Sequence, residues 1–414
     1  MKLNLEFCKN EETLETEQKE LNSKIEEYID NYENMKQNDT SIELMLSLSE
    51  IRQNIINWYQ FKKDAQILEI GANYGEITGY LCDICKNVTS VELSKEKAKI
   101  IEKRYFNKEN LECIVGNLEE IQINKKFDYV ILIGQIEKAS KWLPNSNNPE
   151  KDLLIDVSKM LKEDGKILLA TDNKFGMKYW NGKKDLEGTL GYKNLAEERT
   201  ENGSKLFSEI KLKDLIKEAG YQNYKFYYTL PDYKMPNLIY SADYEITKED
   251  ISRNFEYYEK DELINFVENG VYLELLNENK EIFNFFANSF FVEIGNQEIK
   301  NDIKYITFSN YRKEKYRIMT IIKDEEVIKK AANKKAREHI KNILKSNLEF
   351  NKKNAKIIEE QKEDKIVSKY INKERFDIFL ERIDEKSFIE NFEKYANILY
   401  QNALDFGQIE KNVE

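Results

Sequence analysis

A glycine loop beside a buried carboxylate is the stretch best suited to hold a nucleotide-like ligand. Residues 67–78 read ILEIGANYGEIT, an apolar run that contains Glu69, then Gly71 and Gly75 with three residues between them, then a helix start. This order predicts a buried strand, a tight turn and a helix, the corner at which Rossmann-like units hold a ligand. Gly71 can adopt backbone angles that a Cβ forbids, and Gly75 allows close approach to the main chain. The spacing differs from the G-x-G-x-x-G of dinucleotide sites.

Polar groups follow three further predicted strands. Glu92 ends the second strand, 23 residues after Glu69 (92 − 69), and its carboxylate can accept hydrogen bonds from both hydroxyls of a ribose. Asn117 follows the third strand, where its amide could pair with an adenine edge. The backbone at 134–136 follows the fourth. Because the carboxyl ends of parallel strands meet at one edge of a doubly wound sheet, we expect a single site there.

The elements that must position these groups alternate between strand and helix. Strands are expected at 66–70, 88–92, 111–115, 127–133 and 166–171, with helices at 76–85, 95–105 and 152–161. Alternation of this kind predicts parallel pairing with right-handed crossovers, and therefore an α/β, doubly wound, mostly parallel sheet. Two helices, at 10–35 and 41–59, are expected to pack on it.

Composition excludes several classes of function. The chain has 414 residues and a net charge of −11, which does not favour nonspecific binding to nucleic acid or anionic membranes. We find no signal peptide and no apolar run long enough to span a bilayer, so a cytoplasmic location is expected. Four cysteines are too few for a disulfide framework, and Cys82 and Cys85 fall within an expected helix, where packing is the favoured interpretation. No metal site is expected, and the single histidine, His339, rules out a histidine base in the first domain.

Residues 172–245 differ from the alternating region. All four prolines of the chain lie between positions 144 and 236, among many aromatic residues. Rigid loops with aromatic side chains suit a shaped binding surface. The same aromatics could instead close a core beneath long loops, and the sequence favours neither alternative.

Together these motifs resemble the class I S-adenosylmethionine-dependent methyltransferases. The resemblance rests on E-x-G-x-x-x-G, the acid that ends the second strand, and FDYVILIGQIEKA at 127–139. The segments RQNIINWYQF, NKFGMKYWNG, FYYTLPDYKMPNLIYS and FFANSFFVEI are similar to one bacterial group, found among genes for surface-polysaccharide and glycan assembly. The likeness spans roughly residues 42–294.

The resemblance implies S-adenosylmethionine as the cofactor. Its methionine and ribose end would contact Glu69, Gly71, Ala72, Asn73, Gly75 and Thr78. Glu92 and Leu93 would hold the ribose, Asn117 and Leu118 the adenine, and Gly134 and Gln135 would border the ligand. Aspartate is the commoner residue of the family at the positions of Asn117 and Glu69.

The acceptor implied by the resemblance is a sugar hydroxyl of a surface glycan or glycan precursor. Methyl transfer mainly requires alignment and exclusion of water, which agrees with the missing histidine. A carboxylate base would add about 10²–10⁴-fold. Candidates are Asp172, Asp185, Glu187 and Asp232, although a solvated or capping role is favoured for each. Expected acceptor contacts are Asn173, Lys174, Tyr179, Trp180 and Tyr233, since amides and aromatic faces suit sugar rings.

The carboxyl-terminal part is expected to hold antiparallel strands at 285–294, 304–310 and 315–322, followed by charged helices. It resembles a degenerate small lobe of a kinase-like fold, with Lys329 or Lys330 at the position of the phosphate-binding lysine. The predicted division is 1–60, 61–295 and 296–414. The terminal helices would bind a second copy or a glycan-assembly enzyme. Two rival functions are a catalytically silent scaffold and a methyltransferase for a protein or small-molecule acceptor.

Overall fold

The fold is taken from a computed structural model of the chain. It describes residues 1–8, 16–29, 31, 35, 41–184, 191–196, 198–199, 203–248, 250–251, 262–354, 358–362, 365–370 and 376–405. Among these residues, no helix is both long and apolar enough to cross a membrane.

A parallel sheet forms the first half of the fold. Its strands run in the order β1 (Lys2–Asn4), β4 (Leu111–Val115), β3 (Asn87–Glu92), β2 (Gln66–Ile70), β5 (Phe127–Ile133) and β6 (Leu161–Asp172). The parallel pairing and five of these strands confirm the sequence prediction, although β6 begins earlier than expected. The short strand β1 was not predicted. From β2 the order rises through β3 and β4 on one side and through β5 and β6 on the other, as in doubly wound sheets, and β1 is added at the β4 edge.

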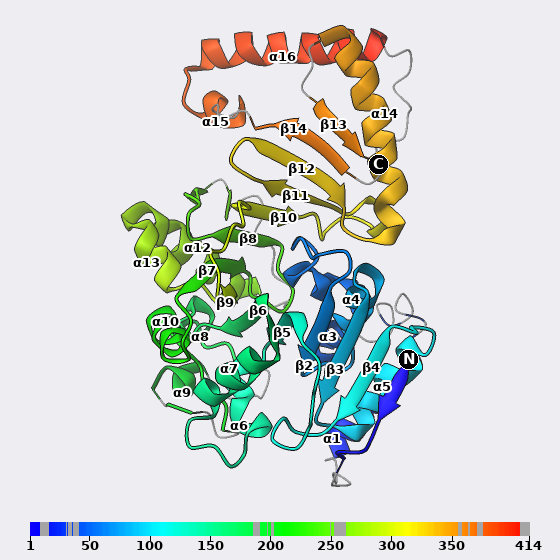
Figure 1. Ribbon diagram of the computed structural model, residues 1–414. Coiled ribbons are helices and arrows are strands. Elements are labelled where there is room, and N and C mark those ends of the chain that lie inside the picture. The colour runs from blue at the N-terminus through cyan, green and yellow to red at the C-terminus, as the bar shows by residue number, and fades with distance from the viewer. Residues whose placement is uncertain are drawn as a thin grey trace.

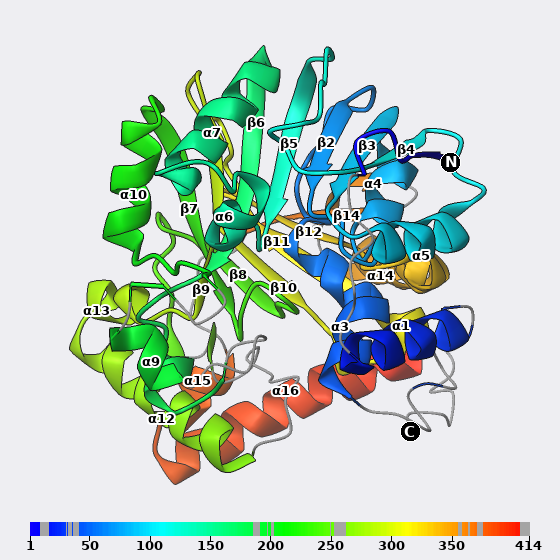
Figure 2. The same cartoon turned by 90° about the horizontal axis from the view of Figure 1, so that it is seen from below.

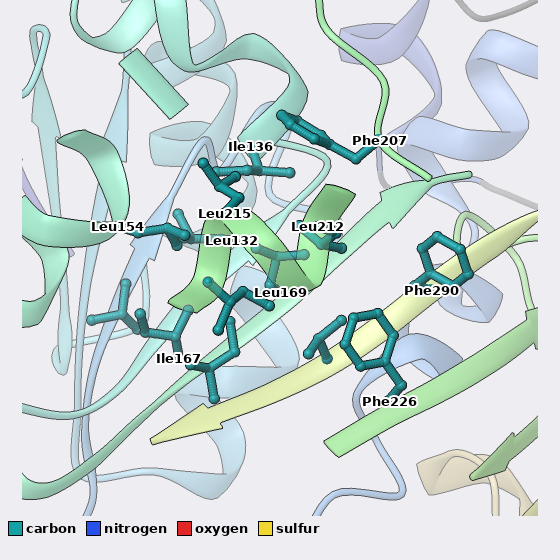
Figure 3. Packing of buried hydrophobic residues seen from close by; sticks show 14 of the residues in the cluster. Leu132, Ile136, Leu154, Ile167, Leu169, Phe207, Leu212, Leu215, Phe226 and Phe290 are labelled. Atoms are coloured by element: carbon teal, nitrogen blue, oxygen red, sulfur yellow. The ribbon is translucent and has the colours of Figure 1, made fainter. Parts of the chain in front are cut away.

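Helices cover both faces of this sheet. One face packs against α7 (Pro149–Met160) and α10 (Glu209–Glu218), and the other against α4 (Thr78–Ile84) and α5 (Lys95–Tyr105). Figure 2 shows these two pairs at opposite sides of the molecule. Neighbouring residues of β6 serve different faces, with Leu169 in the first core and Leu168 in the second, as the alternation of a strand requires. Figure 3 shows the first core.

The helices before the sheet differ from the prediction. Helix α1 (Thr16–Tyr28) lies within the expected 10–35 segment, whose remaining residues lie partly outside the described ranges. The expected helix at 41–59 is instead α3 (Ile42–Leu48) followed by the 3-10 helix η1 (Glu50–Ile55). Ser49 separates them, because its extended backbone ends α3 while its hydroxyl accepts from Ile51 N and starts η1.

A reversed strand and a hairpin extend the sheet beyond β6. Strand β9 (Ser289–Gly295) lies antiparallel between β6 and β7 (Asn223–Leu230), and β8 (Leu238–Ser241) pairs with β7. The strand expected at 285–294 therefore begins later, because α13 (Lys280–Phe285) follows α12 (Glu262–Glu278) up to that point. Shorter elements connect the strands, namely η2 (Ile136–Lys138), α6 (Ala139–Trp142), α8 (Met177–Trp180) and α9 (Gly191–Ala196).

The carboxyl-terminal strands continue the same sheet. Strand β10 (Tyr305–Phe308) pairs with β8, and β11 (Ile318–Ile322), β12 (Glu326–Ala331), β14 (Lys365–Lys369) and β13 (Ile358–Lys362) follow, all antiparallel. Figure 1 shows them above the parallel strands, with α14 (Arg337–Asn354) at one side and α16 (Glu385–Asp405) across the top. The remaining described elements are η3 (Glu314–Tyr316), η4 (Lys334–Ala336) and α15 (Phe376–Glu381).

The kinase-like interpretation stays a prediction. Lys330 does not point to an open phosphate site, because its Nζ donates to the carbonyl of Asn57 at 3.0 Å and joins β12 to the amino-terminal segment. Lys329 is exposed. The predicted boundary at residue 296 falls between β9 and β10 within one continuous sheet, and the division into three parts remains a proposal.

Candidate functional site

A cavity of about 310 Å³ opens where the parallel strands end. Its lining includes eight residues that the sequence analysis assigned to a cofactor, namely Glu69, Gly71, Ala72, Asn73, Glu92, Leu93, Gly134 and Gln135. They come from the ends of β2, β3 and β5, as expected for a ligand site in a doubly wound sheet. Tyr233, expected as an acceptor contact, lies in the same lining.

The glycine loop forms the floor of this cavity. Gly71 has a φ of +76°, and its N–H donates to the carbonyl of Val91 at 2.8 Å, which ties the loop to β3. A Cβ on Gly71 would lie 2.1 Å from Cδ of Gln135, so both its backbone angle and its surroundings require glycine. Gly75 is not in the lining. Its φ is +81°, and its carbonyl accepts from the hydroxyl of Tyr105 at 2.7 Å.

Glu92 is held by three backbone N–H groups. Its Oε2 accepts from Asn73 at 2.7 Å, and its Oε1 accepts from Leu93 and Ser94, each at 3.0 Å. Burial raises the pKa of Glu92, while Lys97 and these donors oppose the shift. An ionised carboxylate has about four lone-pair sites, and the three N–H groups occupy three of them, so capacity remains on Oε2 for one ribose hydroxyl and not for both. The loop therefore presents Glu92 in one fixed orientation.

Glu69 is supported by two hydroxyl groups. Thr78 and Ser90 both donate to its Oε2 at 2.7 Å. Thr78, which the sequence analysis expected to contact the cofactor, is not in the cavity lining. It acts on the cavity through its hydrogen bond to Glu69. Burial raises the pKa of Glu69 to about 7, because the hydroxyls only partly offset the loss of water.

This shift predicts a pH effect on stability. A raised carboxyl pKa in the folded state contributes stability below the ordinary value of 4.5, and this contribution is lost as pH rises through about 7. Glu69→Gln keeps an oxygen for Thr78 and Ser90 but cannot ionise. We expect the wild type to lose stability relative to Glu69→Gln between about pH 5 and pH 8. Urea unfolding of both proteins across this range measures the difference, and parallel profiles would contradict the burial argument.

Charged groups that the sequence analysis missed also line the cavity, namely Arg52, Glu76, Lys97, Lys138 and Lys141. The Asn73 side chain donates from Nδ2 to Glu76 at 2.7 Å, and its Oδ1 accepts from Lys97 at 2.7 Å. Glu76 and Lys97 therefore fix the glycine loop through Asn73. Arg52 lies within a segment that the resemblance singled out, although no role was assigned to it. The other lysines lie on helices that gave no sequence signal.

The carboxylates proposed as bases form buried ion pairs instead. Lys178 Nζ lies 2.6 Å from Asp172 and 3.2 Å from Asp232, and Lys234 Nζ lies 2.8 Å and 3.4 Å from the same two. All four side chains are buried and outside the cavity lining. These aspartates are therefore buried and not solvated, which corrects that interpretation of them, while their role as bases stays a prediction. Asp185 and Glu187 lie outside the described residues.

Two of the five predicted acceptor contacts, Asn173 and Tyr179, serve the fold. Asn173 donates to the carbonyls of Phe285 and Ala287, and the fully buried Tyr179 donates to Asp172 at 3.1 Å. Lys174 and Trp180 are not in the cavity lining, and Trp180 is exposed. Within 172–245, the aromatics of β7 and β8 belong to the core, as the second alternative expected, whereas Tyr233 lines the cavity.

Comparison with known proteins finds a family match over the segment that holds most of this site. Residues 68–169 match the family model described as a methyltransferase domain. A 76-residue segment is 29% identical to ribosomal RNA small subunit methyltransferase A of Fusobacterium nucleatum, covering 18% of this chain and 29% of that protein. The chain thus spans less than a third of the length of this relative.

Two solved structures align with the chain at low sequence identity. A possible histamine N-methyltransferase from Thermotoga maritima aligns at 15% identity and a TM-score of 0.38, covering 67% of this chain and all of that one. Phosphoethanolamine N-methyltransferase 1 from Haemonchus contortus aligns at 13% identity and a TM-score of 0.39, covering 68% of this chain and 50% of that one. Residues 68–169 thus match a methyltransferase domain, and S-adenosylmethionine is the cofactor that this match supports.

Two buried polar atoms fit such a cofactor. Arg52 Nε, in the cavity lining, has no hydrogen-bond partner among the described residues, and a guanidinium suits the carboxylate of the methionine part. Asn117 Oδ1 is likewise buried without a partner in the described part of the chain, and it could accept from the adenine amino group. Asn117 and Leu118 follow β4 but are not in the lining, so their contact with adenine stays a prediction.

Proposed function

We propose that this protein transfers the methyl group of S-adenosylmethionine to a hydroxyl of a surface glycan or glycan precursor in the cytoplasm. The observation that carries the methyl transfer is the oriented carboxylate of Glu92 beside the Gly71 loop, within the segment that matches the methyltransferase family. The glycan acceptor rests on the resemblance of residues 42–294 to the bacterial group associated with glycan assembly.

The residues that line the cavity would bind S-adenosylmethionine and align its methyl group with the acceptor. When bound, S-adenosylmethionine supplies a methyl group that is already activated by positive charge on sulfur. Glu92 would hold the ribose, Arg52 the carboxylate, and Glu69 would place negative charge near the cationic end. Gln135 receives a hydrogen bond from Trp142 Nε1 at 3.1 Å, which fixes its amide beside Gly71. Preorganised groups of this kind lower the barrier by holding reactants in line.

The proposal is tested by comparing surface glycans from cells with and without the gene. Mass spectrometry should find a loss of 14 mass units per missing methyl group, about one CH₂, in one glycan of the deleted cells, restored by the wild-type gene. An unchanged glycan profile together with a lost methyl group on a protein or metabolite would support the alternative acceptors. Cofactor binding without any lost methyl group would support the silent scaffold.

The carboxyl-terminal helix offers a surface for a partner. Helix α16 exposes a series of large apolar side chains, namely Phe388, Ile389, Phe392, Tyr395, Ile398, Leu399 and Tyr400. Clusters of this kind on a protein surface commonly mark interaction sites. This face supports the proposal that the terminal helices bind a second copy of the chain or a glycan-assembly enzyme. Light scattering of the purified protein distinguishes a dimer from a monomer that awaits another partner.

A further inference from the structure

Tyr233 places a hydroxyl group at the wall of the cavity. It follows β7, and its backbone N–H donates to Oγ of Ser289 at 2.7 Å, which fixes the loop on β9. A Cβ on Gly134 would lie 2.6 Å from the Tyr233 hydroxyl, so the glycine at the end of β5 makes room for it. The tyrosine is only 6% exposed, and it lines the same cavity as the glycine loop.

Behind this hydroxyl lies a buried carboxylate. The Tyr233 hydroxyl donates to Glu137 Oε1 at 3.2 Å, and the Thr171 hydroxyl donates to Glu137 Oε2 at 2.8 Å. Glu137 is 6% exposed and belongs to η2, directly after the strand end that borders the cavity. The three side chains form a continuous path from the cavity to β6.

Glu137 differs from the other carboxylates nearby. Asp172 and Asp232 are neutralised by Lys178 and Lys234, whereas no lysine or arginine of the described chain forms an ion pair with Glu137. An unpaired buried carboxylate is costly, and such groups cluster at functional sites. Burial, and the nearby charge of Asp172, raise the pKa of Glu137, while Lys138 and the Thr171 hydroxyl oppose the shift.

The other charges around the pair come from several elements. The charged groups that act on Tyr233 are Asp172 on β6, Asp232 in its own loop and Arg52 on η1, besides Glu137 itself. Burial and these carboxylates raise the pKa of Tyr233 well above its ordinary value, so its hydroxyl stays protonated. A neutral tyrosine can pass a proton on but cannot take one without giving up its own.

We propose that Tyr233 and Glu137 form a proton relay that accepts the proton of the acceptor hydroxyl during methyl transfer. The acceptor oxygen forms its bond to the methyl carbon, and the sulfur keeps the electron pair of the bond that breaks. The acceptor proton passes to Tyr233 Oη while the proton of Tyr233 passes to Glu137 Oε1. One carboxylate becomes neutral as one sulfonium becomes a thioether, so charge balances.

The relay rests on the proposed function. It adds the chemical class of acceptor that the site selects. An alcohol keeps its proton at neutral pH and gains from a base, whereas a free amine attacks through a lone pair that it already has. A buried carboxylate behind a tyrosine therefore suits transfer to oxygen. Tyr233 touches the acceptor and is the catalytic residue, while Glu137 acts through it as a positioning residue.

The experiment compares Tyr233→Phe and Glu137→Gln with a matched pair outside the cavity. Tyr228 donates to Glu209 Oε2 at 3.1 Å in the same kind of hydrogen bond, so Tyr228→Phe and Glu209→Gln are the controls. Each protein transfers a tritiated methyl group from S-adenosylmethionine to an extract of cells that lack the gene. Calorimetry with S-adenosylhomocysteine reports in parallel whether each variant is folded and binds.

Both relay variants are expected to transfer the methyl group about 100-fold more slowly, with S-adenosylhomocysteine affinity within about twofold of wild type. The wild-type rate falls as pH is lowered through one ionisation, and Glu137→Gln lacks this step because it removes the titrating group. Rates near wild type in both relay variants, or equal losses in the controls, would overturn the relay. If Glu137→Gln fails to bind S-adenosylhomocysteine, the transfer rate of Tyr233→Phe alone tests the relay. An extract left unlabelled by the wild type contradicts the proposed function instead.

Discussion

Glu92→Ala should weaken the binding of S-adenosylhomocysteine by about 100-fold, the largest single effect expected in the cavity. The change removes a charged acceptor for a ribose hydroxyl, and a hydrogen bond to a charged group contributes about 1.5–3 kcal/mol. It also leaves the N–H groups of Asn73, Leu93 and Ser94 without their acceptor, which loosens the loop. Isothermal titration calorimetry measures the affinity directly.

A carboxylate on the neighbouring strand provides the control for this experiment. Glu112 on β4 pairs with Lys2 and Lys125 at the surface and lies outside the cavity lining. Glu112→Ala should leave the affinity within about twofold, since exposed ion pairs contribute little and it touches no ligand. Equal affinity for wild type and a folded Glu92→Ala would remove Glu92 from the ribose site.

Asp172→Asn should lower the free energy of unfolding by about 3–5 kcal/mol, the largest stability effect expected for a polar residue of this chain. The substitution removes one of the two carboxylates that contact both buried lysines, Lys178 and Lys234, and leaves Asp232 as the other. Breaking a buried pair is costly because the remaining charge has neither water nor a full set of partners. Urea unfolding monitored by circular dichroism measures the change.

Two further variants separate charge from shape. Asp172→Asn with Lys178→Met removes one charge of each sign, so this double variant should recover part of the lost stability. Asp164→Ala removes an exposed carboxylate that pairs with Lys62 at 2.5 Å, and it should cost less than about 1 kcal/mol. A single Asp172→Asn variant within about 1 kcal/mol of wild type would show that the cluster is not held by its charges.

Local pattern was sufficient for the central strands and the glycine loop. The stretches 66–70, 111–115 and 127–133 were predicted with the bounds that the structure has, because strands covered by helices on both faces are continuous apolar runs. Glu69, Gly71 and Glu92 were located because Glu69 is the one acidic residue within such a run, Gly71 follows that run, and Glu92 ends the next strand. Parallel order then brought these strand ends together at one cavity.

Contacts between residues far apart in the chain could not be predicted from local sequence pattern. Arg52 donates to the carbonyl of Lys234 at 2.5 Å across 182 residues, and nothing near either residue indicates the other. Asp172 has the appearance of a loop carboxylate in sequence, and only the fold places two lysines against it. Glu137 was likewise overlooked, because a glutamate in a short 3-10 helix has no periodic signal of burial.

Cofactor binding tests the central claim most directly. Isothermal titration calorimetry of the wild-type chain should show one S-adenosylhomocysteine bound per chain, and no binding of NAD under the same conditions. The result follows from the G-x-x-x-G loop and from the carboxylate of Glu92, which is fixed by three backbone N–H groups. A folded protein that binds neither S-adenosylhomocysteine nor S-adenosylmethionine would contradict the assignment of this cavity.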